Sequence, residues 1–502
     1  MTIPLFERAQ RNGERTAIVA DSHLYSYRQL LQQSGQAAAA LLQLVDKPDL
    51  QEARIAFLTP RGFDYVAAQW GIWRAGGLAV PLCEAHPQPE LAYVLDDADV
   101  SAVVAHPEFA DKLRPLAAAR QLPLILTSTL YETTAGNLPD LTLERRAMML
   151  YTSGTTGRPK GVVSTHGNIQ AQATTLVSAW GWTADDYIIN ILPLHHVHGI
   201  INILTCALWV GATCEIRAKF DTAEVWSRLA SGDLTLFMAV PTIYARLIQA
   251  WEAAPPEQQA AMSAGCARLR LMVSGSAALP VSTLQKWQQI SNHTLLERYG
   301  MTEIGMALSN PLNGLRKPGF VGQPLPGVEI RLVDENGQVV EPGLPGEIQV
   351  KGPAVFREYF RRPDATIQAF REGWFCTGDT AVFEDGAYRI LGRNSVDIIK
   401  TGGYKVSALE IEEVLRTHPA IQECAVVGVE DPVWGERVCA AIIPVTDELL
   451  SLEALRDWAR ERLAPYKLPS RLTMLDDLPR NTMGKVTKPQ VAALFQANNQ
   501  DD

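Results

Sequence analysis

The sequence predicts an α/β protein with a large N-terminal body of mixed, mostly parallel sheets and a small C-terminal domain. Across the first part of the chain, short apolar runs bounded by Gly, Pro or Ser alternate with stretches that have helical apolar spacing. Strand and helix in alternation are typical of parallel sheets covered by helices. The predicted strands include residues 53–60, 78–82, 100–106, 122–127, 234–241 and 269–275.

Two changes along the chain complete the predicted architecture. Between residues 321 and 388 the sequence turns to short strands and turn signals such as DENGQ and EPGLPGE, which indicate a small β-barrel-like antiparallel element. After residue 395 a new α+β unit begins, with helices at 407–418 and 451–464 and strands at 420–429 and 436–445. We therefore expect two domains, residues 1–394 and 395–502, the second having the size of a small independent domain.

Composition narrows the classes of function. A chain of 502 residues is too long for one simple core, and its net charge of -10 argues against a general nucleic-acid binder. The seven cysteines contain no C-x-x-C pair, which favours reduced thiols over disulfides or a zinc site. The first residues lack the apolar core of a secretory signal, and no run approaches the length of a membrane span. We expect a soluble cytoplasmic protein, monomeric or homodimeric, with small-molecule partners.

The most informative segment is YTSGTTGRPKG at 151–161. Small residues let the backbone approach a ligand, and successive N–H groups with several hydroxyls offer donors to phosphate oxygens. Lys160 adds a positive charge. The apolar MML before this loop and the helical pattern after it predict a strand–loop–helix unit, although a Walker A motif cannot be placed here. The alternative is a flexible surface linker.

At this loop the sequence begins to resemble the adenylate-forming superfamily of acyl-CoA synthetases, luciferases and peptide-synthetase adenylation domains. The resemblance implies that the loop grips the β- and γ-phosphates of ATP. The residues concerned are Thr152, Ser153, Gly154, Thr155, Thr156, Gly157 and Lys160. It also implies the fold of that superfamily, in which the small C-terminal domain is a mobile lid.

Further motifs follow in the order that this superfamily shows. YGMTE at 299–303 resembles its Y-G-x-T-E, which implies Tyr299 against the adenine, Thr302 near the α-phosphate and Glu303 as a Mg²⁺ ligand. TGD at 377–379 and LGR at 391–393 imply that Asp379 and Arg393 contact the ribose. Each motif taken alone would more often be an ordinary turn.

The C-terminal motifs imply roles for the mobile lid. PRNTMGK at 479–485 resembles the family's P-x-x-x-x-G-K, so Lys485 should enter from the lid and stabilise charge at the α-phosphate. The alternative is that Lys485 is an ordinary solvent-exposed lysine. The family's swivel position is Ser395 here, where many relatives carry Asp or Lys. Lys400, Gly402 and Gly403 resemble the loop that approaches the pantetheine arm of coenzyme A.

Two segments are predicted to line the acyl site. In LPLHHVHG at 192–199, His196 is expected to form a wall or gate of the catalytic site. A zinc site is the alternative, but the H-H-x-H spacing lacks a further ligand cluster. In VPTIYARL at 240–247, Arg246 would suit a substrate with a second carboxylate, which a guanidinium binds bidentately. The alternative places Arg246 on the solvated face of its helix.

Within the superfamily, these segments most resemble malonyl-CoA synthetases, including those that act on methylmalonate. The resemblance implies that malonate, ATP and coenzyme A give malonyl-CoA, AMP and pyrophosphate. Arg246 would hold the distal carboxylate and Met306 would face C2. The assisting residues are His198, Ser274, Gly275 and Ser276.

Three alternative functions are also consistent with the family resemblance, two of them ligases and one not enzymatic. One is an acyl-CoA synthetase for a monocarboxylate such as a short fatty or hydroxycinnamic acid. The second is a free-standing adenylation domain that loads a carrier protein. A non-catalytic nucleotide-binding regulator would predict the loss of Glu303 or Lys485, and both are present.

Overall fold

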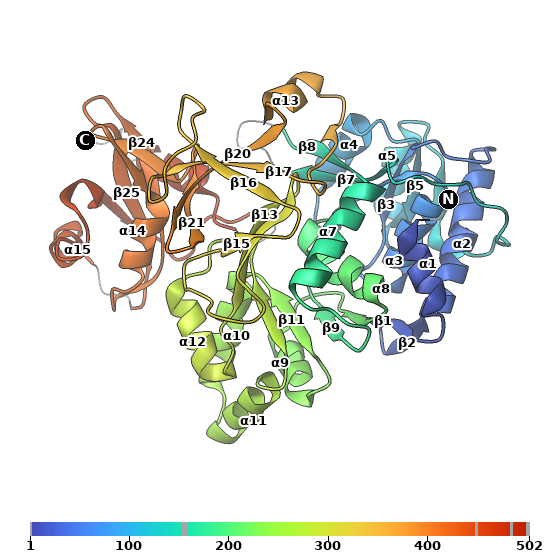
Figure 1. Cartoon of the computed structure of the whole chain (residues 1–502), viewed down its shortest axis with the longest axis horizontal. Helices are drawn as coiled ribbons and strands as arrows, with labels where there is room; N and C mark the ends of the chain where they lie inside the picture. The colour runs from blue at the N-terminus through green and yellow to red at the C-terminus, as the bar shows by residue number, and fades with distance from the viewer. Residues whose placement is uncertain (1–2, 153–157, 447–449, 482–484, 498–502) are drawn as a thin grey trace.

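The computed structural model of the chain describes residues 3–152, 158–446, 450–481 and 485–497. It has the α/β architecture that the sequence predicts, with two large sheets, a smaller antiparallel sheet and a C-terminal α+β unit. In Figure 1 the C-terminal unit, in orange and red, lies at one end of the molecule beside the antiparallel sheet. Within the described residues, no helix is long and apolar enough to cross a membrane.

The first large sheet has nine strands in the order β15-β14-β13-β12-β11-β9-β10-β1-β2. The strands from β13 to β1 in this order are parallel, and the edges are antiparallel. The bounds are β1 (Thr16–Ala20), β2 (His23–Ser26), β9 (Tyr187–Asn190), β10 (Thr213–Ile216), β11 (Leu236–Ala239), β12 (Leu271–Ser274), β13 (Leu296–Met301), β14 (Gly305–Ser309) and β15 (Gln323–Pro324).

The second large sheet has seven strands in the order β18-β8-β7-β4-β3-β5-β6. It is parallel from β7 to β6, whereas β8 and β18 run antiparallel at the other edge. The bounds are β3 (Arg54–Leu58), β4 (Leu78–Pro81), β5 (Ala102–Ala105), β6 (Leu124–Leu126), β7 (Arg146–Thr152), β8 (Lys160–Thr165) and β18 (Glu358–Tyr359). Each apolar run predicted as a strand contains one.

The setting of the glycine-rich loop differs from the prediction. The loop joins β7 to the antiparallel strand β8, with Thr152 opposite Lys160, and α7 (His166–Ala179) begins only after β8. The expected strand–loop–helix unit is therefore wrong, because the β-branched run after Lys160 pairs with β7 as a strand. Within the described residues, β7 and β8 form an antiparallel pair on either side of the loop, and α7 follows β8.

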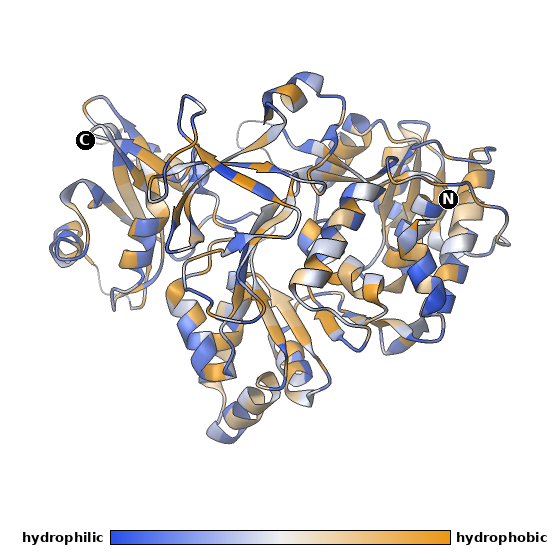
Figure 2. Ribbon diagram, in the orientation of Figure 1, coloured by the Kyte–Doolittle hydropathy of each residue, from blue (hydrophilic) through white to orange (hydrophobic). Residues whose placement is uncertain are grey.

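Helices cover both large sheets and enclose a shared apolar core. Figure 2 shows apolar residues concentrated in the strands, with hydrophilic residues on the outer helices. One buried cluster combines residues of both sheets with the fully buried Trp70 and Trp73 of α3, Trp180 at the end of α7 and Trp287 of α12. The remaining helices of the body are α1 (Pro4–Arg11), α2 (Tyr27–Leu44), α3 (Phe63–Arg74), α4 (Gln88–Asp97), η1 (Pro107–Phe109), α5 (Ala110–Ala118), α6 (Thr127–Leu130), the π-helical η2 (His198–Thr205), α8 (Cys206–Val210), α9 (Thr222–Ser231), α10 (Pro241–Ala253), α11 (Pro256–Cys266), α12 (Val281–Ser291) and α13 (Pro363–Gln368).

The segment predicted as barrel-like forms a five-stranded antiparallel sheet. Its order is β16-β17-β20-β19, with β21 paired to β20. The bounds are β16 (Glu329–Val333), β17 (Gly346–Lys351), β19 (Phe370–Arg371), β20 (Trp374–Glu384) and β21 (Ala387–Arg393). The sheet buries an aromatic cluster that includes Phe356 and Phe375, whose rings meet edge to face.

The C-terminal unit has its own sheet and its own apolar clusters, all from residues after 395. The strands are β22 (Ile398–Thr401), β23 (Tyr404–Ser407), β24 (Ile421–Asp431), β25 (Gly435–Pro444) and β26 (Arg471–Met474). The helices are α14 (Ala408–Leu415), α15 (Leu452–Ala459), η3 (Pro465–Lys467) and α16 (Lys488–Ala497). The predicted boundary between residues 394 and 395 falls in the turn that joins β21 to β22.

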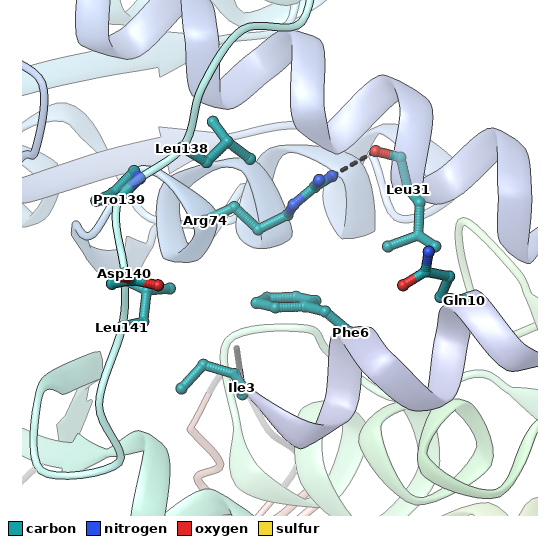
Figure 3. Close-up of a pocket in the computed structure, with 9 residues that line it drawn as sticks. All are labelled: Ile3, Phe6, Gln10, Leu31, Arg74, Leu138, Pro139, Asp140 and Leu141. Atoms are coloured by element: carbon teal, nitrogen blue, oxygen red, sulfur yellow. Dashed lines mark hydrogen bonds between the residues drawn. The ribbon is translucent and has the colours of Figure 1, made fainter. Parts of the chain in front are cut away.

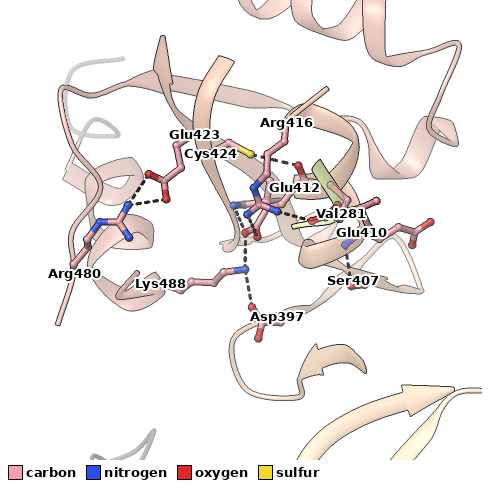
Figure 4. A network of polar contacts seen from close by, with 12 residues as sticks. Val281, Asp397, Ser407, Glu410, Glu412, Arg416, Glu423, Cys424, Arg480 and Lys488 are labelled. Carbon is pink, nitrogen blue, oxygen red and sulfur yellow. Dashed lines mark hydrogen bonds and ion pairs between the residues drawn. The ribbon is translucent and has the colours of Figure 1, made fainter. Parts of the chain in front are cut away.

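A buried ion network ties that turn to the C-terminal unit (Figure 4). Lys488 Nζ lies 2.6 Å from Asp397 Oδ1 and 2.8 Å from Glu412 Oε1. Glu412 also contacts Arg416 and accepts the N–H of Val426 at 2.8 Å. The side chains of Lys488 and Glu412 are only 12% and 4% exposed, so the ammonium offsets buried negative charge.

Replacing this lysine should destabilise the C-terminal unit. In Lys488→Met two buried carboxylates lose their shared cation, which typically costs about 3–5 kcal/mol. Urea unfolding followed by circular dichroism should show a C-terminal transition at lower urea. Lys286→Met is the matched control, because its pair with Glu252 is solvent-exposed and should contribute at most about 1 kcal/mol. Equal midpoints for the two variants would contradict the role of the network.

Candidate functional site

The phosphate end of the site is built by Lys160 on β8, Glu303 after β13 and Tyr359 on β18. The Tyr359 hydroxyl donates to Glu303 Oε1 at 3.0 Å, and Lys160 Nζ lies 5.1 Å from the centroid of the Tyr359 ring. Glu303 is 5% exposed, and burial raises the pKa of its carboxyl group. Among the described residues its carboxylate has no ion pair with Lys or Arg. A buried, uncompensated carboxylate oxygen is a suitable ligand for Mg²⁺.

The predicted phosphate loop is described only at its two ends. Thr152 ends β7 directly opposite Lys160. The predicted phosphate ligands Ser153, Gly154, Thr155, Thr156 and Gly157 lie outside the described residues. Thr302, predicted near the α-phosphate, lies between Tyr299 and Glu303 in sequence and lines a cavity of about 20 Å³ beside α7.

The predicted nucleoside residues lie together on β13, β20 and β21. Tyr299 donates its hydroxyl to Asp379 Oδ2 at 2.6 Å, and Arg393 Nε lies 3.8 Å from Asp379 Oδ1. Asp379 is 8% exposed, and burial raises its pKa. The preceding Gly378 has φ of 73°, a conformation that suits glycine in the tight T-G-D turn. A carboxylate held in this way can accept hydrogen bonds from two ribose hydroxyls.

Lys485 reaches the body of the protein from the C-terminal unit. Burial first, and then the charges of Arg298 and Arg393, lower its pKa to about 8, while Asp379 acts in the opposite direction. Its own backbone is fixed by Asn481, whose Oδ1 accepts the Lys485 N–H at 3.0 Å. Lys485 of the C-terminal unit therefore lies close to Arg298, Arg393 and Asp379 of the body.

Arg298 is the residue that sequence reasoning missed. It precedes Tyr299 on β13, is only 4% exposed, and donates from Nη2 to Ser276 Oγ at 3.3 Å. Its Nε is buried without a hydrogen-bond partner, and within the described chain no carboxylate pairs with it. Burial lowers its pKa to about 9. A buried guanidinium without an acid is a ready binding site for an anion.

One feature could have indicated Arg298: it is a charged residue within an otherwise buried strand. The Y-G-x-T-E motif begins only at the next residue, Tyr299, and so does not include it. Gly275 explains how the side chain fits, because a Cβ at Gly275 would lie 2.5 Å from Arg298 Nε. This close approach requires glycine at position 275.

Of the predicted acyl-site histidines and serines, Ser276 and His198 lie beside Arg298. His198 Nδ1 lies 3.1 Å from Ser276 Oγ, and the Nε2 atoms of His196 and His198 are buried without partners. Ser274 Oγ is likewise buried and unpaired. Burial lowers the pKa of His196 to about 4 and that of His198 well below its ordinary value. Both rings are therefore neutral at physiological pH and add polar groups without adding charge.

Arg246 and Met306 differ sharply in exposure. Arg246 lies on α10 and is exposed to solvent. It does not belong to the buried Arg298 cluster, and the reason is helical geometry: Tyr244, Leu247 and Ile248 form the buried face of α10. Met306 is 1% exposed and packs beside Gly300.

The residues predicted for the thiol step and the hinge lie in the C-terminal unit. Lys400, Gly402 and Gly403 are at the end of the β22–β23 hairpin, where the Gly402 N–H donates to Trp434 O at 2.9 Å. Ser395 is exposed in the turn before β22. In the part of the chain that the structure describes, no group of three or more His, Cys, Asp or Glu side chains could hold a metal on its own.

A larger cavity lies away from these residues, between α1, α2, α3 and residues 138–141 (Figure 3). It measures about 370 Å³ and has mostly apolar walls, with Arg74 at one side. Arg74 donates to Ser34 Oγ at 2.8 Å and to the carbonyl of Leu31. The walls of this cavity include none of the predicted site residues.

Comparison with known proteins agrees with this geometry. Residues 5–360 match the model of the AMP-binding enzyme family, and residues 410–485 match the AMP-binding enzyme C-terminal domain. A mitochondrial malonate–CoA ligase of Xenopus laevis is 47% identical over 98% of this chain and 92% of its own length. A malonate–CoA ligase of Arabidopsis thaliana is 40% identical over 97% of this chain and 87% of its own. A feruloyl-CoA synthase of Amycolatopsis is 31% identical over 97% of both.

Among solved structures, ATP-bound MatB from Rhodopseudomonas palustris is 34% identical and covers 99% of both chains. Its TM-score is 0.91, whereas the apo form of the same protein gives 0.81. The backbone of this chain therefore resembles the ATP-bound form more than the apo form.

Proposed function

The chain belongs to the AMP-binding enzyme family, and on this premise we propose that it is an AMP-forming ligase that joins malonate to coenzyme A. The observation that carries the substrate assignment is the buried guanidinium of Arg298, which lies near Lys485 and has no acid partner in the described chain. A fatty or aromatic acyl chain would leave this cation uncompensated. A dicarboxylate supplies one carboxylate for reaction and a second for Arg298. Relatives named malonate–CoA ligases support the same assignment.

We assign the distal carboxylate of malonate to Arg298, with Ser276 and the neutral His198 as hydrogen-bonding neighbours. Ser274 and Gly275 complete this wall, and Met306 faces C2, where a methyl group of methylmalonate would lie. Arg246 remains a second candidate, acting from the exposed face of α10 as an electrostatic attractor of the dianion rather than as the buried partner. His196 forms the opposite wall.

In the first step the reacting carboxylate attacks the α-phosphorus of ATP and pyrophosphate leaves. No general base is required, because the carboxylate is ionised at neutral pH. Lys485 and Thr302 stabilise the charge on the α-phosphate oxygens, and Lys160 with the loop at 152–157 holds the outgoing phosphates. Mg²⁺ on Glu303, when bound, would neutralise phosphate charge. Tyr299, Asp379 and Arg393 hold the nucleoside.

In the second step the thiol of coenzyme A attacks the acyl carbonyl and AMP leaves. Lys400, Gly402 and Gly403 would approach the pantetheine arm after the C-terminal unit swings about Ser395 and withdraws Lys485. Polar contacts cross the domain boundary, such as the hydrogen bond from the N–H of Val281 to Glu413. We expect the protein to act in the cytoplasm, as a monomer or homodimer.

A panel of acids tests the reaction and its substrate class. AMP release is measured with ATP, Mg²⁺ and coenzyme A for malonate, methylmalonate, acetate, oxalate and coumarate. We expect malonate to give the highest kcat/KM, because a site with a buried charged partner typically rejects acids lacking the second carboxylate by about 10⁴-fold. A preference for acetate or coumarate would instead indicate a monocarboxylate ligase, as the resemblance to a feruloyl-CoA synthase allows. Acyl transfer to a carrier protein but not to coenzyme A would indicate an adenylation domain.

Two arginine variants locate the distal carboxylate. Arg298→Met should lower kcat/KM for malonate by at least about 10³-fold, because the second carboxylate loses its buried partner. Arg246→Met should have a smaller effect if Arg246 acts only by long-range attraction, and that effect should shrink in high salt. ATP affinity, measured by calorimetry, serves as the control for a folded nucleotide site. A larger loss of kcat/KM in Arg246→Met than in Arg298→Met would show that Arg246 binds the distal carboxylate.

The rate of adenylation should fall as the pH rises through about 8. The pKa of Lys485 is lowered to about 8, so its charged form is present below that value and lost above it. Because kcat/KM reports the free enzyme, its alkaline limb should follow this pKa. The measurement is pyrophosphate release between pH 6 and 10. Lys485→Arg should lose most activity and move the limb to higher pH, since a guanidinium has a higher intrinsic pKa than an ammonium; a limb that stays at about pH 8 would place the titration elsewhere.

A further inference from the structure

A short segment around Tyr359 crosses the phosphate end of the site. The N–H of Phe356 donates to the carbonyl of Glu303 at 2.7 Å. On the other side, the N–H groups of Arg357 and Phe360 donate to Val163 O at 2.9 Å and Gly161 O at 2.8 Å. The segment thus joins β8, which carries Lys160, to the turn that carries Glu303.

Tyr359 is placed between the two charged groups of opposite sign. Its hydroxyl donates to Glu303 Oε1 at 3.0 Å, and the face of its ring lies below Lys160 Nζ at 5.1 Å from the centroid. One oxygen of Glu303 is therefore fixed by a phenol, which leaves the other oxygen for a cation. The ring holds the ammonium by a cation–π contact and keeps it from forming an ion pair with the carboxylate. Within the described residues, neither charge has an ion pair.

We propose that Tyr359 is a positioning residue that holds Glu303 and Lys160 apart, so that a divalent cation and the triphosphate it carries can bind between them. This inference rests on the proposed function, because it requires that the chain bind ATP with Mg²⁺. The phenol fixes Glu303 for the cation, whereas the ring keeps Lys160 from reaching Glu303 and being neutralised by it. Tyr359 touches neither reacting atom and acts through its two neighbours.

The chain offers a matched control at Tyr187. Its hydroxyl donates to Glu215 Oε2 at 2.8 Å, and the guanidinium of Arg228 lies 5.7 Å from the ring centroid. The local geometry is similar, but Glu215 is already paired with Arg217 and Arg228. Tyr187→Phe therefore removes the same kind of hydrogen bond at a carboxylate that has no capacity left for a metal.

The test is calorimetric titration of ATP into the full-length protein, once with excess Mg²⁺ and once with EDTA. For Tyr359→Phe, which keeps the ring, ATP affinity in EDTA should stay within about twofold of wild type. With Mg²⁺ it should fall by roughly tenfold, as expected for a lost hydrogen bond to a charged group. Tyr359→Leu should in addition weaken ATP by roughly threefold in EDTA, because Lys160 loses its ring. Tyr187→Phe should match wild type in both.

The proposal would be overturned if Tyr359→Phe lost equal affinity with and without Mg²⁺, since that pattern indicates general damage to the site. It would equally be overturned if the affinities with Mg²⁺ were unchanged. Failure of wild type to bind ATP under either condition would instead overturn the proposed function itself. Thermal unfolding of each variant in the absence of nucleotide shows whether a loss of affinity comes with a loss of folding.

Discussion

The structure depends on a concentration of buried positive charge where the C-terminal unit meets the body. Arg298 and Lys485 are withdrawn from water, and burial lowers the pKa of each. Among the charged groups that lower the pKa of Lys485, Arg298 has the largest effect. Such an arrangement is costly in an empty protein, because like charges repel in a medium that screens them poorly. Anionic ligands remove that cost. The same electrostatic constraint therefore favours a bound dicarboxylate, a bound triphosphate and the docked position of the lid.

The parallel sheet explains why these groups meet. The strands β9, β11, β12 and β13 are adjacent, and the segments that follow their carboxyl ends carry residues predicted for the acyl and phosphate sites. His196 and His198 follow β9, Ser276 follows β12, and Thr302 and Glu303 follow β13. In open α/β sheets this edge is where ligands bind. The antiparallel sheet then supplies Asp379 and Arg393 from the other side.

Polar contacts join the C-terminal unit to the body, whereas each unit is held together by its own apolar core. The described apolar clusters belong either to the body or to the C-terminal unit, and none combines residues of both. Polar contacts cross the boundary: Glu413 accepts the N–H of Val281, and Lys405 pairs with Glu335 at 2.5 Å. Polar contacts can be exchanged for water without exposing a core. The fold thus allows the lid to move as a unit, while Lys488 keeps Asp397 attached to it.

The sequence by itself determined the α/β architecture and the order of the motifs, because strand periodicity and turn chemistry are local properties. It also determined the family, since several spaced motifs coincide. Tertiary structure alone decided which arginine is buried. Both Arg246 and Arg298 lie in or beside conspicuous motifs, but helix phase turns Arg246 to solvent, and Gly275, directly after the neighbouring strand β12, makes room for Arg298. It likewise decided that β8 pairs with β7 instead of beginning a helix, since strand pairing depends on a partner that local sequence does not specify.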